Sequence, residues 1–180
     1  MIVVITGTNR KNSGTLKFSE FIIDRIRKNG FKEVVHLNLC EIPLSAYENE
    51  TYNEAGQSTE IANIQDKIIL PARKFWFVFP EYNGSYPGVL KLFLDALSVR
   101  SYKKSFQEKK ACLTGISSGR AGNLRGMEHL TAILNHLGVT VMPNQLPVSS
   151  MEQLLNMDGE ICDPETKRMI KRQVREFIEF

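Results

Sequence analysis

Cysteine is scarce in this sequence, and the spacing of the few cysteines excludes several kinds of site. Cys40, Cys112 and Cys162 are far apart and form no C-x-x-C pair or Cys/His ligand pattern. This spacing argues against a structural zinc ion and an iron–sulfur cluster, and the odd count argues against a disulfide framework. We therefore expect a chain without a metal, in a reducing compartment such as the cytoplasm.

The sequence also lacks a long apolar run and a strong net charge. No apolar stretch approaches the length of a membrane span, and Met1 leads directly into an expected strand rather than a signal peptide. The formal net charge is +3, without a basic cluster that alternates with aromatics, so neither a nucleic acid nor a membrane is expected as a partner. The 180 residues suit a single domain, residues 1–180, with a full hydrophobic core.

The sequence does contain a regular alternation of two kinds of apolar segment. Short runs rich in β-branched residues, with little polar alternation, are typical of strands that are covered on both faces. Five such runs are Ile2–Ile5, Val34–Leu39, Phe75–Phe79, Cys112–Ile116 and Val139–Met142. Apolar residues at helical spacing occupy Leu16–Arg27, Ile61–Ile69, Leu90–Leu97, Met127–Leu137 and Met169–Phe177. The alternation predicts an α/β three-layer sandwich, with a five-stranded parallel sheet and helices on both faces.

One segment has neither pattern. Pro43–Ser58 is rich in Glu, Asn, Thr and Tyr. We interpret it as a long exposed connection, with a mobile flap over a site as the alternative.

The first loop whose residues could bind a ligand is Thr6–Thr15, which joins the first expected strand to the first expected helix. A helix start offers unpaired N–H groups and a partial positive charge, and the guanidinium of Arg10 can bind phosphate oxygens in a two-pronged way. The loop also offers the hydroxyls of Thr8, Ser13 and Thr15 and two glycines that allow close backbone approach. These candidate anion-binding residues are Thr8, Arg10, Ser13, Gly14 and Thr15, with Gly7 beside them. An ordinary polar turn with a good N-cap is the alternative.

Two further loops follow later strands and also lead into helices. Pro80–Gly88 carries amide, hydroxyl and phenol groups between prolines and glycines, and its backbone is suited to reading the edge of a flat heteroaromatic ring. Ser117–Asn123 is small and glycine-rich. In flavodoxin-like strand order all three loops converge on one edge of the sheet, where such folds bind ligands. A phosphate site beside contacts for a flat ring suits a mononucleotide with a large planar base, such as FMN.

At these residues the chain resembles the NADPH-dependent FMN reductases. Thr6–Thr15 is similar to their G-S-x-R-x-x-S-x-N/T phosphate loop, and Pro80–Gly88 reads P-E-Y-N-G-S-Y-P-G, close to their P-E-Y-N-x-S-x-P-G motif. The resemblance covers Met1 to about Pro147 and implies a flavodoxin-like fold. It implies FMN phosphate contacts from Thr8, Arg10, Ser13 and Thr15. It implies flavin-ring contacts from Pro80, Glu81, Tyr82, Asn83 and the adjoining Gly84, with Ser117 and Gly119 from the third loop.

The resemblance also implies partners and a quaternary state. Members of the family take NADPH or NADH as co-substrate and reduce quinones, chromate or azo dyes, commonly as homodimers or homotetramers. This chain departs from the family pattern in Thr8, which replaces a serine, and in the bulky Leu92-Phe93-Leu94-Asp95. The bulk makes a subunit contact through that helix less certain.

The implied activity is hydride transfer from NAD(P)H to FMN and then to a quinone, free flavin, metal or azo acceptor, in ping-pong order. No side chain need act as a nucleophile, because the flavin carries the chemistry. We expect backbone N–H groups near Ser117–Gly119 to stabilise charge at the flavin N1–O2 edge. Arg73, Arg100 and Arg120 are candidates for a contact with the extra phosphate of NADPH.

Rival readings of the same residues have less support. A low-molecular-weight phosphatase needs a cysteine where Ile5 stands, and a Walker loop needs Gly-Lys-Ser/Thr, which the first loop lacks. We interpret Trp76 and the three histidines, His36, His129 and His136, as structural. A non-enzymatic FMN carrier or redox sensor of flavodoxin type is the main alternative, although Arg10 and the slightly positive charge favour a reductase. A flavin-free interaction module is the third.

Overall fold

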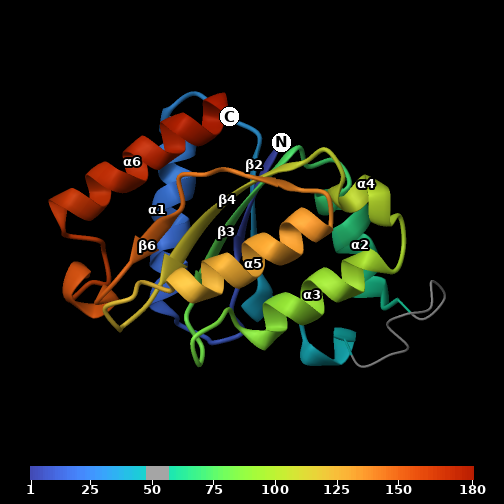
Figure 1. Cartoon of the computed structure of the whole chain (residues 1–180), viewed down its shortest axis with the longest axis horizontal. Coiled ribbons are helices and arrows are strands. Elements are labelled where there is room, and N and C mark those ends of the chain that lie inside the picture. The colour runs from blue at the N-terminus through green and yellow to red at the C-terminus, as the bar shows by residue number, and fades with distance from the viewer. Residues whose placement is uncertain (48–56) are drawn as a thin grey trace.

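The computed structural model describes residues 1–47 and 57–180, which form a parallel sheet between two layers of helices (Figure 1). The sheet order is β2-β1-β3-β4-β5, with β6 also beside β4, and every pairing is parallel. This is the flavodoxin-like order that the sequence predicts. The strands are β1 (Ile2–Thr6), β2 (Val34–Asn38), β3 (Lys74–Pro80), β4 (Lys110–Ile116), β5 (Thr140–Val141) and β6 (Leu146–Val148).

The fifth position of the sheet is divided between two short strands. β5 pairs with Lys110–Ala111 at one end of β4, and β6 pairs with Thr114–Ile116 at the other. Pro143 lies between the two strands and has no N–H group with which to continue the ladder. The expected run Val139–Met142 therefore supplies the first half of this position, and a segment that the sequence pattern did not single out supplies the second.

The helices agree with the apolar spacing, apart from one short element. Five predicted segments are helical, and the second continues from α2 into a π-helical turn, Gln65–Ile69, before Pro71. The helix of five residues, α4, was not predicted, because its length is too short for a periodic signal. The helices are α1 (Gly14–Lys28), α2 (Thr59–Ile64), α3 (Gly88–Ser98), α4 (Tyr102–Phe106), α5 (Leu124–His136) and α6 (Pro164–Glu179).

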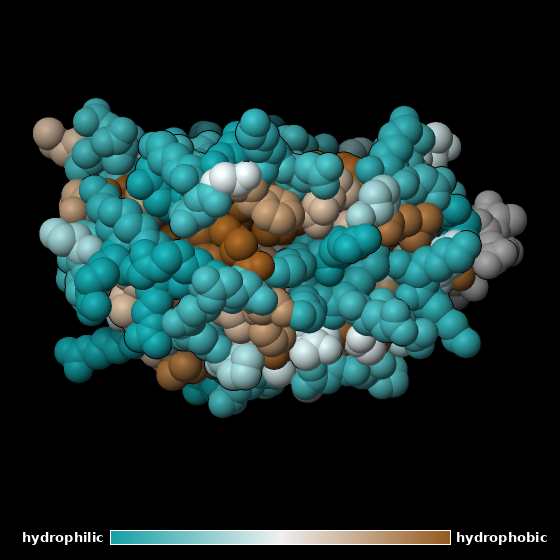
Figure 2. All heavy atoms as spheres, turned by 90° about the horizontal axis from the view of Figure 1, so that it is seen from above, coloured by the Kyte–Doolittle hydropathy of each residue, from teal (hydrophilic) through white to brown (hydrophobic). Residues whose placement is uncertain are grey.

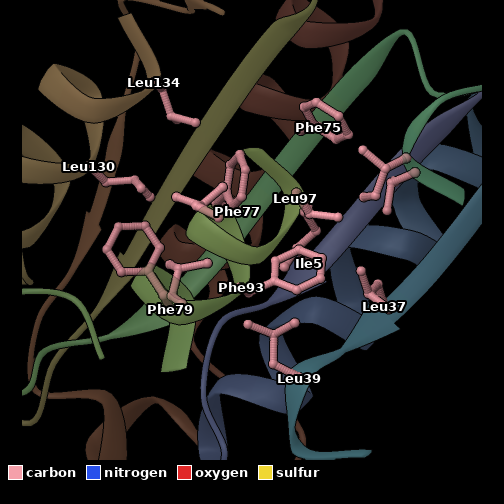
Figure 3. Packing of buried hydrophobic residues seen from close by; sticks show 14 of the residues in the cluster. Ile5, Leu37, Leu39, Phe75, Phe77, Phe79, Phe93, Leu97, Leu130 and Leu134 are labelled. Atoms are coloured by element: carbon pink, nitrogen blue, oxygen red, sulfur yellow. The ribbon is translucent and has the colours of Figure 1, made fainter. Parts of the chain in front are cut away.

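Successive residues of each strand enter two separate cores. Val3 and Ile5 pack with α2, α3 and α5 on one face, whereas Ile2 and Val4 pack with α1 and α6 on the other. Figure 3 shows how three aromatic rings of β3 meet leucines from the helices of the first face. Because both faces are covered, the strands need no polar alternation, which explains why they read as continuous apolar runs.

The bulky residues of α3 serve the core of the chain itself. Phe93 is fully buried and Leu94 is 2% exposed, whereas Leu92 points outward and is 47% exposed. Two of the bulky side chains in Leu92-Phe93-Leu94-Asp95, the segment that departs from the family pattern, therefore pack inside the subunit. Leu92 is the residue that changes the outer surface of the helix.

The last helix, α6, is attached to the sheet by buried polar contacts. Gln173 donates to the carbonyls of Leu113 and Asn144, both at 3.0 Å, and accepts a hydrogen bond from Thr114, which in turn accepts from the indole of Trp76. Trp76 is fully buried and its ring meets Phe177 edge-on at 5.2 Å. All of these polar groups have partners, so the network fixes α6 without an unsatisfied group.

The far end of α6 meets a group of cations at the amino edge of the sheet. Lys74 donates to the carbonyls of Phe177 and Ile178, and Lys110 donates to that of Phe180. Cations stabilise the carbonyl end of a helix. Figure 2 views the molecule from this upper side, where polar side chains cover most of the surface and apolar ones gather near the middle.

The expected connection Pro43–Ser58 is described only in part. Leu44–Tyr47 forms a 3-10 turn, and residues 48–56 lie outside the described residues. Across the described ranges, no helix is long and apolar enough to cross a membrane.

Candidate functional site

The first loop leaves β1 and enters α1 at the carboxyl edge of the sheet. The N–H of Gly7 donates to the carbonyl of Val78 at 2.8 Å, and a Cβ at Gly7 would lie 3.0 Å from Leu90 and from Phe79. Glycine therefore lets the chain cross this close to β3 without a shift of these neighbours. Ser13 caps α1, because its hydroxyl accepts a hydrogen bond from the N–H of Thr15 at 3.2 Å.

The predicted phosphate-binding residues fall into an exposed group and a buried group. Arg10 is exposed, and Ser13 and Gly14 are partly exposed at the start of the helix. Thr8 and Thr15 are each 1% exposed. The hydroxyl of Thr8 accepts the N–H of Arg10 at 3.2 Å, so it shapes the loop from within. The side chain of Arg10 and the amino end of α1 are the parts of the loop that face solvent.

A buried hydrogen-bonded chain supports this loop from below. Thr6 donates to Ser19 at 2.7 Å, and Ser19 donates to the carbonyl of Thr15 at 3.3 Å. Because the hydroxyl hydrogen of Thr6 is used in this way, Nε2 of His36 must donate to Thr6 across their 2.8 Å contact. Burial lowers the pKa of His36, against the opposing effect of Glu41 and Glu20. His36 therefore has the structural role expected of it.

The second loop begins with a tight hairpin. Tyr82 and Ser85 exchange both backbone hydrogen bonds, at 2.8 and 3.0 Å, around Asn83 and Gly84, whose φ angles are +51° and +76°. Positive φ at both central residues is the type I′ geometry that the Asn-Gly pair favours. The Asn-Gly pair is the sequence signal for this hairpin, which sequence reasoning missed. Pro87 directly precedes α3 as its N-cap residue.

The hairpin is bonded to the other two loops. The phenol oxygen of Tyr82 lies 3.0 Å from Oγ1 of Thr8, which joins the second loop to the first. Glu81 accepts a hydrogen bond from Ser117 at 3.0 Å, which joins the second loop to the third. The predicted site residues therefore follow the neighbouring strands β1, β3 and β4 and meet at one edge of the sheet. Tyr82 reaches the first loop with its hydroxyl, a contact that the sequence did not reveal.

The third loop is held by its own backbone and by β6. Ser117 donates its N–H to the carbonyl of Val148 at 2.8 Å, and the N–H of Gly119 donates to the hydroxyl of Ser117 at 3.0 Å. Both of these predicted donors thus have protein partners. Asn123, at φ +64°, ties the end of the loop to β3 by donating to the carbonyl of Phe79 at 3.1 Å. Direct contacts of Ser117 and Gly119 with a flavin remain a prediction.

Sequence reasoning missed two residues of α5 that border the hairpin. Nδ1 of His129 lies 2.9 Å from the hydroxyl of Ser85, and the guanidinium of Arg125 lies 3.7 Å from the carboxylate of Glu81. No motif points to these contacts, because α5 lies more than forty residues further along the chain. The structure retains His129 as a structural residue, now with a role in holding the hairpin.

The three arginines considered for NADPH lie in different places. Arg73 is at the amino edge of the sheet, where its N–H donates to the carbonyl of Met1. Arg100 pairs with Asp66 at 2.8 Å and also donates to Gln57. Arg120 is exposed in the third loop. Arg120 alone of these three belongs to the edge that carries the site.

A hollow of about 960 Å³ lies at the opposite edge of the sheet and contains none of the predicted site residues. It is lined by Met1, Phe31, Lys32, Glu33, Val34, Val35, Pro71, Arg73 and Lys74. We place the site at the three loops instead, because ligands of open parallel sheets bind outside the carboxyl ends of the strands.

The residues at the three loops fit FMN. The first turn of the 15-residue helix α1 carries no acidic residue, and the exposed Arg10 precedes the N-cap Ser13 in the same loop, a combination that suits a phosphate. A Cβ at Gly7 would meet its neighbours at 3.0 Å, so the backbone there forms a close-packed base for the loop. The hairpin that is predicted to contact the flavin ring lies at the same edge, where the phenol of Tyr82 meets Thr8.

Comparison with known proteins shows the family of the chain. Residues 1–153 match the family model of the NADPH-dependent FMN reductases. The chain belongs to this family. An NAD(P)H-dependent FMN reductase of Pseudomonas aeruginosa is 33% identical over 140 residues, which are 77% of this chain and 75% of the relative. An FMN-dependent NADPH-azoreductase of Staphylococcus aureus is 25% identical over 165 residues, 87% of this chain and 81% of the relative.

The NADPH-dependent FMN reductase family is thus the one that the two loop motifs indicated. A solved structure of FerB, an NAD(P)H:(acceptor) oxidoreductase flavoenzyme from Paracoccus denitrificans, has a TM-score of 0.78 and 22% identity, and covers 99% of this chain and 94% of its own. This likeness bears on the fold. The expected family, fold, enzyme class and cofactor pair of FMN with a nicotinamide nucleotide are confirmed.

Proposed function

We propose that this chain is an NAD(P)H-dependent reductase that binds FMN at the three loops and reduces a small acceptor such as an azo compound or a quinone. The observation that carries the proposal is the pair of contacts that join the loops, Thr8 to Tyr82 at 3.0 Å and Glu81 to Ser117 at 3.0 Å. These contacts bring an anion-binding helix start and a ring-binding hairpin to one edge. The azoreductase relative supports the choice of acceptor class.

The residues of the chain bind and orient, whereas the cofactor supplies the reactivity. Bound FMN would supply the two-electron chemistry, with hydride uptake from the nicotinamide nucleotide and reduction of the acceptor as separate half-reactions in ping-pong order. Arg10 and the amino end of α1 would hold the phosphate, because Arg10 is an exposed cation and the start of a helix carries a partial positive charge. The hairpin Tyr82–Ser85 and the loop Ser117–Gly119 border the ring.

We also propose the finer points that the sequence led us to expect. The chain is one FMN-binding domain over residues 1–180, located in the cytoplasm, and it assembles with copies of itself. Leu92 and Leu124, 47% and 51% exposed on α3 and α5, support such assembly. Light scattering tests it, and a mass equal to one chain at working concentration would exclude a stable oligomer.

Purification followed by anaerobic reduction tests the function. We expect a yellow protein whose flavin absorbance is bleached by NADH or NADPH and restored by an azo dye or a quinone. A colourless protein that fails to take up FMN would exclude the proposal. A yellow protein that neither nucleotide bleaches would instead indicate an electron carrier of flavodoxin type. Stopped-flow traces with each nucleotide, followed by the acceptor, test the ping-pong order.

A further inference from the structure

Glu81 stands at the junction between the second and third loops. Its backbone N–H donates to the carbonyl of Ile116 at 2.8 Å, one residue beyond the last paired position of β3 and β4. One oxygen of its carboxylate accepts the hydroxyl of Ser117 at 3.0 Å, and the other lies 3.7 Å from the guanidinium of Arg125. The side chain is 17% exposed. Both its backbone and its side chain therefore connect the hairpin to β4.

Ser117 is a fixed point to which Glu81 is attached. Its N–H donates to the carbonyl of Val148, and its own carbonyl accepts the N–H of Met151 at 3.0 Å. Its hydroxyl accepts the N–H of Gly119, so the hydroxyl hydrogen is directed to Glu81. The serine is 7% exposed. The position of Glu81 is thus set by a residue that the sheet already holds.

We propose that Glu81 is a positioning residue for FMN, whose hydrogen bond with Ser117 holds the Tyr82–Ser85 hairpin where it receives the flavin ring. The inference rests on the proposed function. It goes beyond the direct ring contact expected of Glu81, because the carboxylate acts here through Ser117. A binding site whose loops are already ordered loses less conformational entropy on binding, which strengthens the affinity.

The loss of this bond should move the hairpin without unfolding the protein. The hairpin keeps its two internal hydrogen bonds, and its attachments from Tyr82 to Thr8 and from Ser85 to His129 do not involve Glu81. Arg125 is 69% exposed, so its ion pair with Glu81 contributes little. The hydrogen bond with Ser117 is the contact that the test must isolate.

The experiment measures the Kd of the apo-protein for FMN and for riboflavin in five variants. We expect Glu81→Ala to weaken the binding of both ligands by about tenfold, as expected for the loss of a hydrogen bond to a charged group. Glu81→Gln keeps an acceptor oxygen and should stay within about threefold of the parent, and so should the control Arg125→Ala. Ser117→Ala should match Glu81→Ala, and the double variant should be no weaker than the weaker single variant.

Two results would overturn the inference. One is a Kd of Glu81→Ala equal to that of the parent. The other is additive losses in Glu81→Ala and Ser117→Ala, which would mean that the two residues contact FMN independently. If Glu81→Ala does not fold, Glu81→Leu combined with Ser117→Ala is compared with Ser117→Ala alone, and a further loss contradicts the inference. A parent chain that binds no FMN would refute the proposed function, which is a separate outcome.

Discussion

Replacement of Arg10 by alanine tests the phosphate end of the site most directly. Arg10 is exposed in the loop that leads to the capped start of α1, so its replacement should leave the fold intact while it removes a cation from the proposed phosphate site. A charge-assisted hydrogen bond contributes about 1.5–3 kcal/mol. Because salt and water screen an exposed charge, we take the lower figure, which corresponds to about tenfold in Kd.

The assay is fluorescence titration of the apo-protein with FMN and with riboflavin, which lacks the phosphate. Arg10→Ala should weaken FMN binding about tenfold and leave riboflavin binding unchanged, and the loss should shrink at 1 M salt, where the screening length is about 3 Å. Arg27→Ala is the matched control, because Arg27 is an exposed arginine in the last turn of the same helix. An FMN Kd equal to that of the parent, or an equal loss with riboflavin, would refute the phosphate assignment.

Three further predictions concern the loop contact, the core and a buried cation. Tyr82→Phe removes the hydroxyl 3.0 Å from Thr8 and should weaken FMN binding by about two- to tenfold with the melting temperature unchanged; a Kd equal to that of the parent contradicts this. Gln173→Ala leaves buried partners unpaired and should lower the free energy of unfolding by about 2–4 kcal/mol in urea titrations, and a loss below about 1 kcal/mol would contradict the network. Burial lowers the pKa of Lys109 to about 8 from 10.5, so the folded chain binds fewer protons than the unfolded chain between these values. The free energy of unfolding of the parent, measured relative to that of Lys109→Met, should therefore rise between pH 8 and 10.5, by about 3 kcal/mol at most. A difference between the two proteins that stays constant over this pH range would refute the prediction.

Much of the fold was predictable because strand pairing leaves a clear pattern in the sequence. Ile2 and Val4 face one helical layer, and Val3 and Ile5 face the other, so the run is apolar throughout. The divided fifth position was not predictable from apolar runs. β6 contains Pro147 and has three residues, and its pairing depends on β4, which lies about thirty residues earlier. A strand of three residues has little stability of its own, so β6 forms only through its pairing with β4.

The candidate site, like the fold, has a part that the sequence predicts and a part that only the tertiary structure shows. The sequence by itself predicted the site residues and determined the family, because a glycine-rich strand-to-helix loop with Arg10 and the motif at Pro80–Gly88 are local features whose backbone requirements appear in the residue types. Only the tertiary structure decided how these residues are joined. The contacts of Thr8 with Tyr82 and of Glu81 with Ser117 span 74 and 36 positions of the chain. No local pattern encodes such a contact, since it arises from the order of strands that brings three loops to one edge.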